Sequence, residues 1–128
     1  MSKRLFFIFF IGVFFFFGSS NALMAHEHGG MGSTHDIAVK GEIVDSLCYL
    51  GMGAKGPSHK QCGIDCAKAG IPVSIVEEGT GKVYVLMSNQ DKTGLPDSVT
   101  HKMGETVTIK GDLYSTGGSQ IIAVEEVS

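Results

Sequence analysis

The sequence predicts an all-β domain with short helices: a five-stranded, OB-like β-barrel that carries a cysteine-bearing helix after its first strand. Five segments alternate apolar and polar residues, as half-buried strands do. A short helical segment separates the third strand from the fourth, and this order of elements matches the OB barrel. The predicted strands cover residues 36–46, 72–78, 82–88, 105–115 and 120–127.

The first strand is predicted at residues 36–46, DIAVKGEIVDS. Ile37, Val39 and Ile43 fall on one face of this strand, because side chains alternate between the two faces. Gly41 indicates a bulge or a bend. The glycine-rich stretch that follows, residues 47–57, is predicted to be a loop.

A helix is predicted at residues 59–69. Ser58 is suited to the N-cap, and Gln61 three residues later would complete a capping box. Gly70 is suited to the position after the helix, and Pro72 prevents its continuation. The only strongly apolar side chain in this helix is Ile64. We therefore expect its cysteines to supply much of its attachment to the barrel.

The rest of the chain predicts two hairpins separated by a short helix. Residues 72–78 and 82–88 flank a glycine-containing turn, which is typical of a β-hairpin. A short helix is expected near 96–103, ending at Gly104. The last two strands are joined by the turn Thr116-Gly117-Gly118-Ser119.

The N-terminus has the three-part pattern of a secretory signal peptide over residues 1–25. Lys3 and Arg4 precede an apolar run from Leu5 to Phe17, and small or polar residues follow. Cleavage after Ala22 or after Ala25 would release the mature protein. The apolar run is shorter than the roughly 20 residues of a membrane span. We expect a periplasmic or secreted protein with no stable membrane anchor after cleavage; the alternative is an uncleaved N-terminal anchor.

Removal of the signal peptide changes the composition. Residues 26–35 then form a flexible tail rich in His, Met and Gly, and residues 36–128 form the barrel domain. All eight Phe residues leave with the signal peptide, as do two of the ten basic residues, so eight lysines face thirteen acidic residues. An acidic domain without stacking rings is poorly suited to nucleic acid, so we expect no nucleic-acid partner.

Two stretches resemble known proteins. The C-terminal hairpin GETVTIKGDLYSTGGSQIIAVEEV resembles the small OB-fold-like domains of exported bacterial proteins, and this resemblance extends over residues 36–127. DSLCYL…HKQCGIDCAKAG-IP is similar to the D-x2-C-Y-L…H-x2-C-x3-C signature of an uncharacterised exported group within that class. This resemblance implies the fold and export, but no activity.

Four side chains with metal-binding chemistry lie between residues 45 and 70. His59, Cys62 and Cys66 have the spacing i, i+3, i+7, which places them on one face of a helix. Cys48 precedes a loop long enough to fold back onto that face. Thiolate and imidazole ligands suit Cu(I) or Zn(II). The sequence therefore predicts a copper or zinc site in an exported metal-binding or metal-handling domain, with Asp45, Met52 and Asp65 as spare donors.

The same cysteines allow two other interpretations. Cys48 bonded to Cys62 or Cys66 would form a disulfide staple in a structural or interaction module, with one thiol left over. Alternatively, Cys62 and Cys66 could exchange disulfides as a redox pair. A thiol oxidoreductase is the only enzymatic interpretation considered, because no nucleophile–base set or carboxylate pair is evident, and we expect no enzyme.

A second, weaker metal site is predicted in the tail. Cleavage after Ala25 would leave His26-Glu27-His28 as the new terminus, and an amine with His28 at the third position can bind Cu(II). A solvated linker that happens to hold histidines is the alternative. If the domain has a protein partner, we expect another exported protein; the sequence does not predict an oligomeric state.

Overall fold

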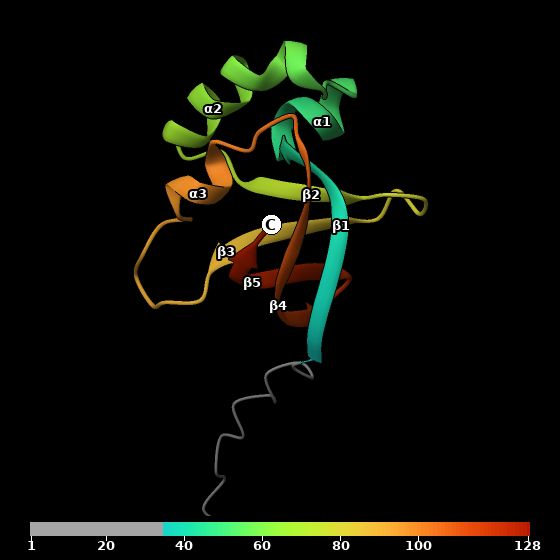
Figure 1. The fold of residues 1–128 in the computed structure, drawn as a ribbon, viewed down its shortest axis with the longest axis vertical. Helices are drawn as coiled ribbons and strands as arrows, with labels where there is room; N and C mark the ends of the chain where they lie inside the picture. The colour runs from blue at the N-terminus through green and yellow to red at the C-terminus, as the bar shows by residue number, and fades with distance from the viewer. Residues whose placement is uncertain (1–34) are drawn as a thin grey trace, which may run out of the picture.

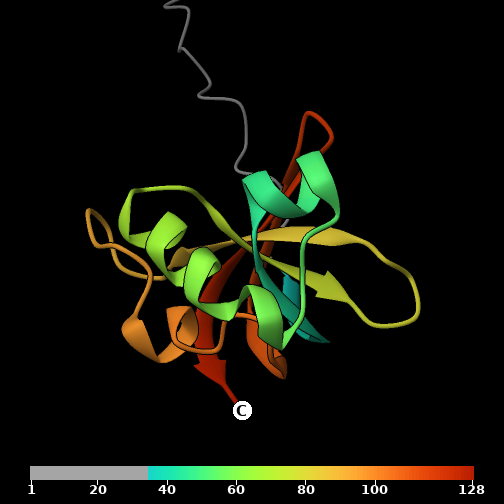
Figure 2. The ribbon, with the colours of Figure 1, turned by 90° about the horizontal axis from the view of Figure 1, so that it is seen from above.

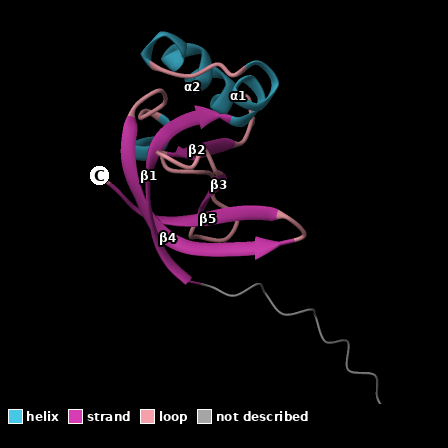
Figure 3. Ribbon diagram, turned by 90° about the vertical axis from the view of Figure 1, so that its right-hand side faces the viewer, coloured by secondary structure: helices cyan, strands magenta, loops and turns pink. Residues whose placement is uncertain are grey.

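Five strands close into a barrel in the computed structural model, which describes residues 35–128 (Figures 1 and 3). They are β1 (His35–Asp45), β2 (Val73–Glu77), β3 (Val83–Ser88), β4 (Thr106–Thr116) and β5 (Ser119–Val127). Their order is β1-β2-β3-β5-β4, and β4 pairs with β1 to close the barrel. β3 and β5 are parallel, and the other pairs are antiparallel. The predicted five-stranded OB-like barrel is confirmed.

The first described residue, His35, lies in β1, one residue before the predicted start of the barrel domain. This residue was expected in the tail, but it pairs with Leu113 of β4. The predicted signal peptide and residues 26–34 of the predicted tail lie outside the described residues.

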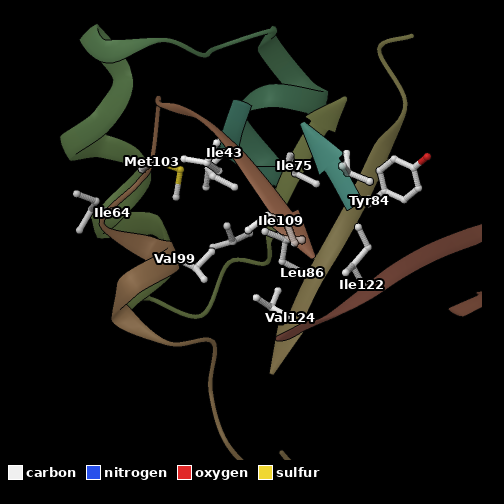
Figure 4. Close-up of a cluster of buried hydrophobic side chains, with 13 residues drawn as sticks. Ile43, Ile64, Ile75, Tyr84, Leu86, Val99, Met103, Ile109, Ile122 and Val124 are labelled. Atoms are coloured by element: carbon white, nitrogen blue, oxygen red, sulfur yellow. The ribbon is translucent and has the colours of Figure 1, made fainter. Parts of the chain in front are cut away.

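Alternating apolar residues of the strands fill the barrel interior (Figure 4). Val39 and Ile43 of β1 are buried, as the alternation predicts. Both faces of β2 are buried: its outer residues Ser74 and Val76 are buried as well as its inner ones, and Ser74 bonds Ser46, the residue after β1, Oγ to Oγ at 2.7 Å. The largest fully buried apolar side chains are Ile43, Ile75, Met103, Ile109 and Ile122.

Gly41 lies where β1 contacts β2 on one side and β4 on the other. A Cβ atom at this position would lie only 2.2 Å from the Val76 carbonyl oxygen, so the close strand approach requires glycine. The register shift of the barrel is elsewhere, between Lys110 and Gly111 of β4.

Three helical segments between β1 and β2 form a helical cap, residues 46–70, over one end of the barrel (Figures 1 and 2). They are α1 (Ser46–Met52), the 3-10 turn η1 (Pro57–His59) and α2 (Lys60–Lys68). The helix predicted at 59–69 is thus found within one residue at each end. Gly70, with φ of 93°, ends it as predicted, and the Ile71 amide donates to the Cys66 carbonyl oxygen at 3.0 Å.

Two predictions about the cap are wrong. Residues 47–57 were predicted as a loop, but most of α1 lies within them. The capping box of Ser58 and Gln61 does not form, because the chain enters α2 through η1 and His59 occupies the N-cap without a side-chain hydrogen bond. The 3-10 turn satisfies backbone amides that a capping side chain would otherwise bond: the His59 amide donates to the Gly56 carbonyl oxygen at 3.0 Å.

The short helix α3 (Asp97–Thr100) lies between β3 and β4, within the predicted 96–103. Val99 and Met103 enter the barrel core beside Ile64 of α2. Gly104 follows with φ of 74°, and its amide donates to the Ile43 carbonyl oxygen at 2.7 Å. This segment therefore joins the end of β1 to the underside of α2.

Polar contacts also hold the cap on the barrel. The Glu42 carboxylate accepts a hydrogen bond from the Gly56 amide, and the Lys60 ammonium pairs with the Glu105 carboxylate. Lys102 donates to the other oxygen of Glu105 at 3.1 Å. These contacts hold the segment that leads into α2, and this segment includes the predicted ligand His59.

Candidate metal centre

Cys48 lies on α1, directly after the end of β1. Asp45, the last residue of β1, caps this helix: its Oδ1 accepts a hydrogen bond from the Cys48 amide at 2.8 Å. Both residues are inaccessible or nearly so, since Asp45 is 0% and Cys48 8% exposed. The cap bond therefore fixes the first thiol where the barrel meets the helical cap.

Cys62 and Cys66 lie one turn apart on α2, so their side chains leave the helix on the same face. Cys66 is half-buried and Cys62 is exposed. The sulfur atoms of Cys48, Cys62 and Cys66 all lie within 4.8 Å of one another. All three are free thiols. The cysteines predicted from their spacing thus converge from two helices into one thiol triad.

His59 belongs to a second triad. Its Nε2 lies 2.8 Å from Asp45 Oδ2, and the ligand atoms of Asp45, Cys48 and His59 lie within 4.8 Å of one another. His59 is in η1, before the first residue of α2, and a 3-10 turn has three residues per turn rather than 3.6. His59 therefore does not lie on the same helical face as Cys62 and Cys66, as it would if α2 were regular from residue 59. Cys48 is the member that the two triads share.

The electrostatics of the centre favour the protonated form of two of its thiols, Cys48 and Cys66. A hydrogen bond to the Asp45 carboxylate, burial and the charge of Asp45 together raise the pKa of the Cys48 thiol to about 12. Burial, then the charge of Asp45, raises the pKa of Cys66. A metal ion must therefore displace thiol protons when it binds.

Burial alone would raise the pKa of Asp45, because it disfavours the charged carboxylate. The hydrogen bonds from the Cys48 amide, from His59 and from the Cys48 thiol outweigh burial and lower the pKa. Among the residues that the structure describes, His59 is the only basic side chain within bonding distance of this carboxylate, with Nε2 2.8 Å from Oδ2. Asp45 is thus a buried anion held by hydrogen bonds on both oxygens.

Sequence reasoning understated Asp45, which it treated only as a spare donor. An aspartate directly before a short helix is a typical N-cap, and this signal in D-S-L-C could have placed it beside Cys48. The other spare donors stay apart: Met52 is 75% exposed, and Asp65 accepts from Gln61 at 2.9 Å. The weaker site, His26 and His28, lies outside the described residues.

Comparisons of the chain with protein-family models, curated proteins and solved structures gave no match. Over residues 35–128, no helix is long and apolar enough to cross a membrane.

Proposed function

We propose that the domain binds a soft metal ion, Cu(I) or Zn(II), through Cys48, Cys62 and Cys66. The observation that carries this proposal is the convergence of three free sulfur atoms within 4.8 Å of one another. Three cysteine thiolates favour soft and borderline ions over hard ones such as Mg²⁺ or Ca²⁺. The exposed Cys62 gives an incoming ion a first ligand, and the buried Cys48 gives it a water-excluded end point.

The test is a Cu(I) titration of the reduced protein against a chromogenic chelator of known affinity. Wild type should take copper from the chelator, and Cys62→Ser and Cys66→Ser should each lose tight binding, because two thiolates remain. Asp65→Asn is the matched control on the same helix, since among the described residues the Asp65 carboxylate accepts a hydrogen bond from Gln61 alone, and it should bind as wild type does. Equal binding by wild type and by a variant with all three cysteines changed to serine would refute the proposal.

A disulfide staple is the second candidate function of these cysteines. The sulfur atoms of Cys48 and Cys66 lie within 4.8 Å of each other, and a disulfide between them would tie α1 to α2. Such a bond would close a loop of about 18 residues, which is worth roughly 3 kcal/mol in the chain-entropy model. A thiol count on protein from its native compartment separates the candidates: one free thiol indicates the staple, and three indicate the metal site.

We also propose that the domain acts outside the cytoplasm. The signal-peptide pattern of residues 1–25 supports this. Mass spectrometry of the mature protein should find a chain beginning at Leu23 or His26. A chain that keeps Met1 or Ser2 and stays in the cytoplasm would contradict export.

A further inference from the structure

We infer that Asp45, Cys48 and His59 form a second metal position that takes a divalent borderline ion such as Zn(II). Cys48 would then bridge this ion and the soft ion of the thiol triad. The inference rests on the proposed function for its first ion, but it concerns a different set of donors. It replaces a single four-ligand site with two adjacent sites.

The geometry of the second triad suits zinc. In a tetrahedral site with bonds of about 2.0–2.3 Å, neighbouring ligand atoms lie about 3.3–3.8 Å apart. The three donor atoms already lie within 4.8 Å of one another, so binding requires side-chain shifts of about 1 Å. Carboxylate oxygen, thiolate sulfur and imidazole nitrogen are all regular zinc ligands. Three protein ligands leave a fourth position for water or for another donor.

Charge favours a second ion. With a metal in the thiol triad, the three thiolates and the Asp45 carboxylate carry four negative charges in one cluster. A single Cu(I) offsets one of these charges and a single Zn(II) offsets two. Because Asp45 is 0% and Cys48 8% exposed, the remaining charge is stabilised by hydrogen bonds rather than by bulk water, and a buried cluster of like charges favours a counter-ion. A divalent ion between Asp45 and His59 would supply the missing positive charge.

A metal ion can reach the second triad from solvent. The His59 side chain is 18% exposed, so its edge of the triad reaches solvent, whereas Asp45 closes the inner side. The neighbouring loop is fixed by the Glu42 bond to the Gly56 amide and by the Lys60–Glu105 pair. His59 is therefore held next to Asp45 before any ion arrives, which lowers the cost of ordering the ligands.

The experiment counts ions in reduced protein. Wild type is titrated with Zn(II), and separately loaded with one Cu(I) and then given Zn(II), and bound metal is measured after desalting. We expect two Zn(II) per chain in the first case and one Cu(I) plus one Zn(II) in the second. His59→Gln and Asp45→Asn should each keep only the ion of the thiol triad. Asparagine still caps a helix, so Asp45→Asn preserves the fold of α1.

Cys62→Ser gives the reciprocal result: it should lose the ion of the thiol triad and keep one Zn(II). His101→Ala, at the exposed end of α3, is the matched histidine control and should bind two. X-ray absorption on the two-ion form should show a metal–metal distance of about 3.5–4 Å.

Three outcomes would overturn the inference. If wild type binds one ion and His59→Gln still binds it, Asp45 and His59 are not ligands, and they only position Cys48. One ion that is lost in both His59→Gln and Cys62→Ser would indicate a single shared site. In both cases the proposed metal-binding function stands. No bound ion in wild type would refute the proposed function and the inference together.

Discussion

Asp45 connects the barrel to the helical cap through both of its carboxylate oxygens. Oδ1 caps α1 and Oδ2 bonds His59, so Asp45→Ala removes a helix cap and leaves a half-buried imidazole without its partner. We expect reduced, metal-free Asp45→Ala to lose about 1–3 kcal/mol of unfolding free energy in urea. Asp36→Ala, at an exposed position of the same strand, should change it little. Equal effects of the two variants would contradict the role of Asp45.

The decrease of unfolding free energy at acidic pH should also depend on Asp45. Its pKa is lower in the folded protein than in the unfolded chain, so its ionised form stabilises the fold above pH about 4, and this contribution is lost as the pH falls. The difference in unfolding free energy between wild type and Asp45→Asn should therefore narrow as the pH decreases from 6 to about 3. Urea unfolding of both proteins across this range checks it, and parallel curves would contradict it.

The raised pKa of Cys48 predicts a loss of unfolding free energy at alkaline pH. Its pKa rises to about 12 on folding, so the protonated thiol stabilises the fold below the unfolded value of about 8.5. That contribution disappears as the pH rises above this value. Reduced, metal-free wild type should thus lose stability faster than Cys48→Ser between pH 8 and about 10.5. The other alkaline groups are common to both proteins, so equal slopes would contradict the raised pKa.

The residue spacing predicted that the three cysteines converge, but it did not predict that His59 belongs to a separate triad with Asp45 and Cys48. Cys62 and Cys66 are on a regular helix, where periodicity decides which side chains share a face. His59 is in η1, and whether a chain enters a helix through a 3-10 turn depends here on contacts of Gly56 with Glu42 and Gly104, which are distant in sequence. Asp45 reaches the site only because β1 ends where α1 begins, a boundary that local patterns locate poorly.

At the scale of elements, Gly63 of α2 lies directly against Met103, a core residue between α3 and β4. A Cβ on Gly63 would lie 2.4 Å from Met103 Cγ, and Met103 is 1% exposed, so it has little room to shift. Gly63→Ala should therefore cost about 1–3 kcal/mol despite the better helix propensity of alanine.

Gly51→Ala in α1 is the matched control for this contact. A Cβ there meets nothing within 4 Å, so alanine should raise the unfolding free energy by about 0.5–1 kcal/mol. Thermal unfolding of both reduced variants checks the pair. Stabilisation by Gly63→Ala would show that α2 does not pack on Met103 in solution.

The strands were predictable because half-buried strands alternate visibly, and the OB-like barrel fold followed from the number of strands and the position of the helical segment between the third and the fourth. α1 was not, because its apolar side chains do not face the core. Leu47 is 62% and Leu50 68% exposed, and the one buried residue of this helix is Cys48. A helix held by an aspartate cap and one thiol lacks the apolar stripe that reveals amphipathic helices.

Across the described residues, the core belongs to the barrel. Of its thirteen buried members, the helical cap contributes only Ile64. Beyond Ile64, Gly63 and Ala67 of α2 pack on the core, and the remaining attachment of the cap comes from single polar contacts and from the candidate metal centre, which joins the end of β1 to α1 and α2. The barrel and the cap should therefore both form without metal, but the metal-free cap should open locally more often than the barrel until an ion binds.

Metal removal tests this division of the molecule. In reduced, metal-free protein, amides of α2 should exchange with deuterium much faster than amides of β4 and β5, because the cap opens without unfolding the barrel. Free ion at about 100 times its Kd should slow cap exchange by on the order of 100-fold, which corresponds to about 2.7 kcal/mol. Cys62→Ser, given the same Cu(I), should show no such protection. If removing the metal abolished the β-type circular dichroism, or if cap and barrel amides exchanged together in the metal-free state, the barrel would depend on the ion and this division would be wrong.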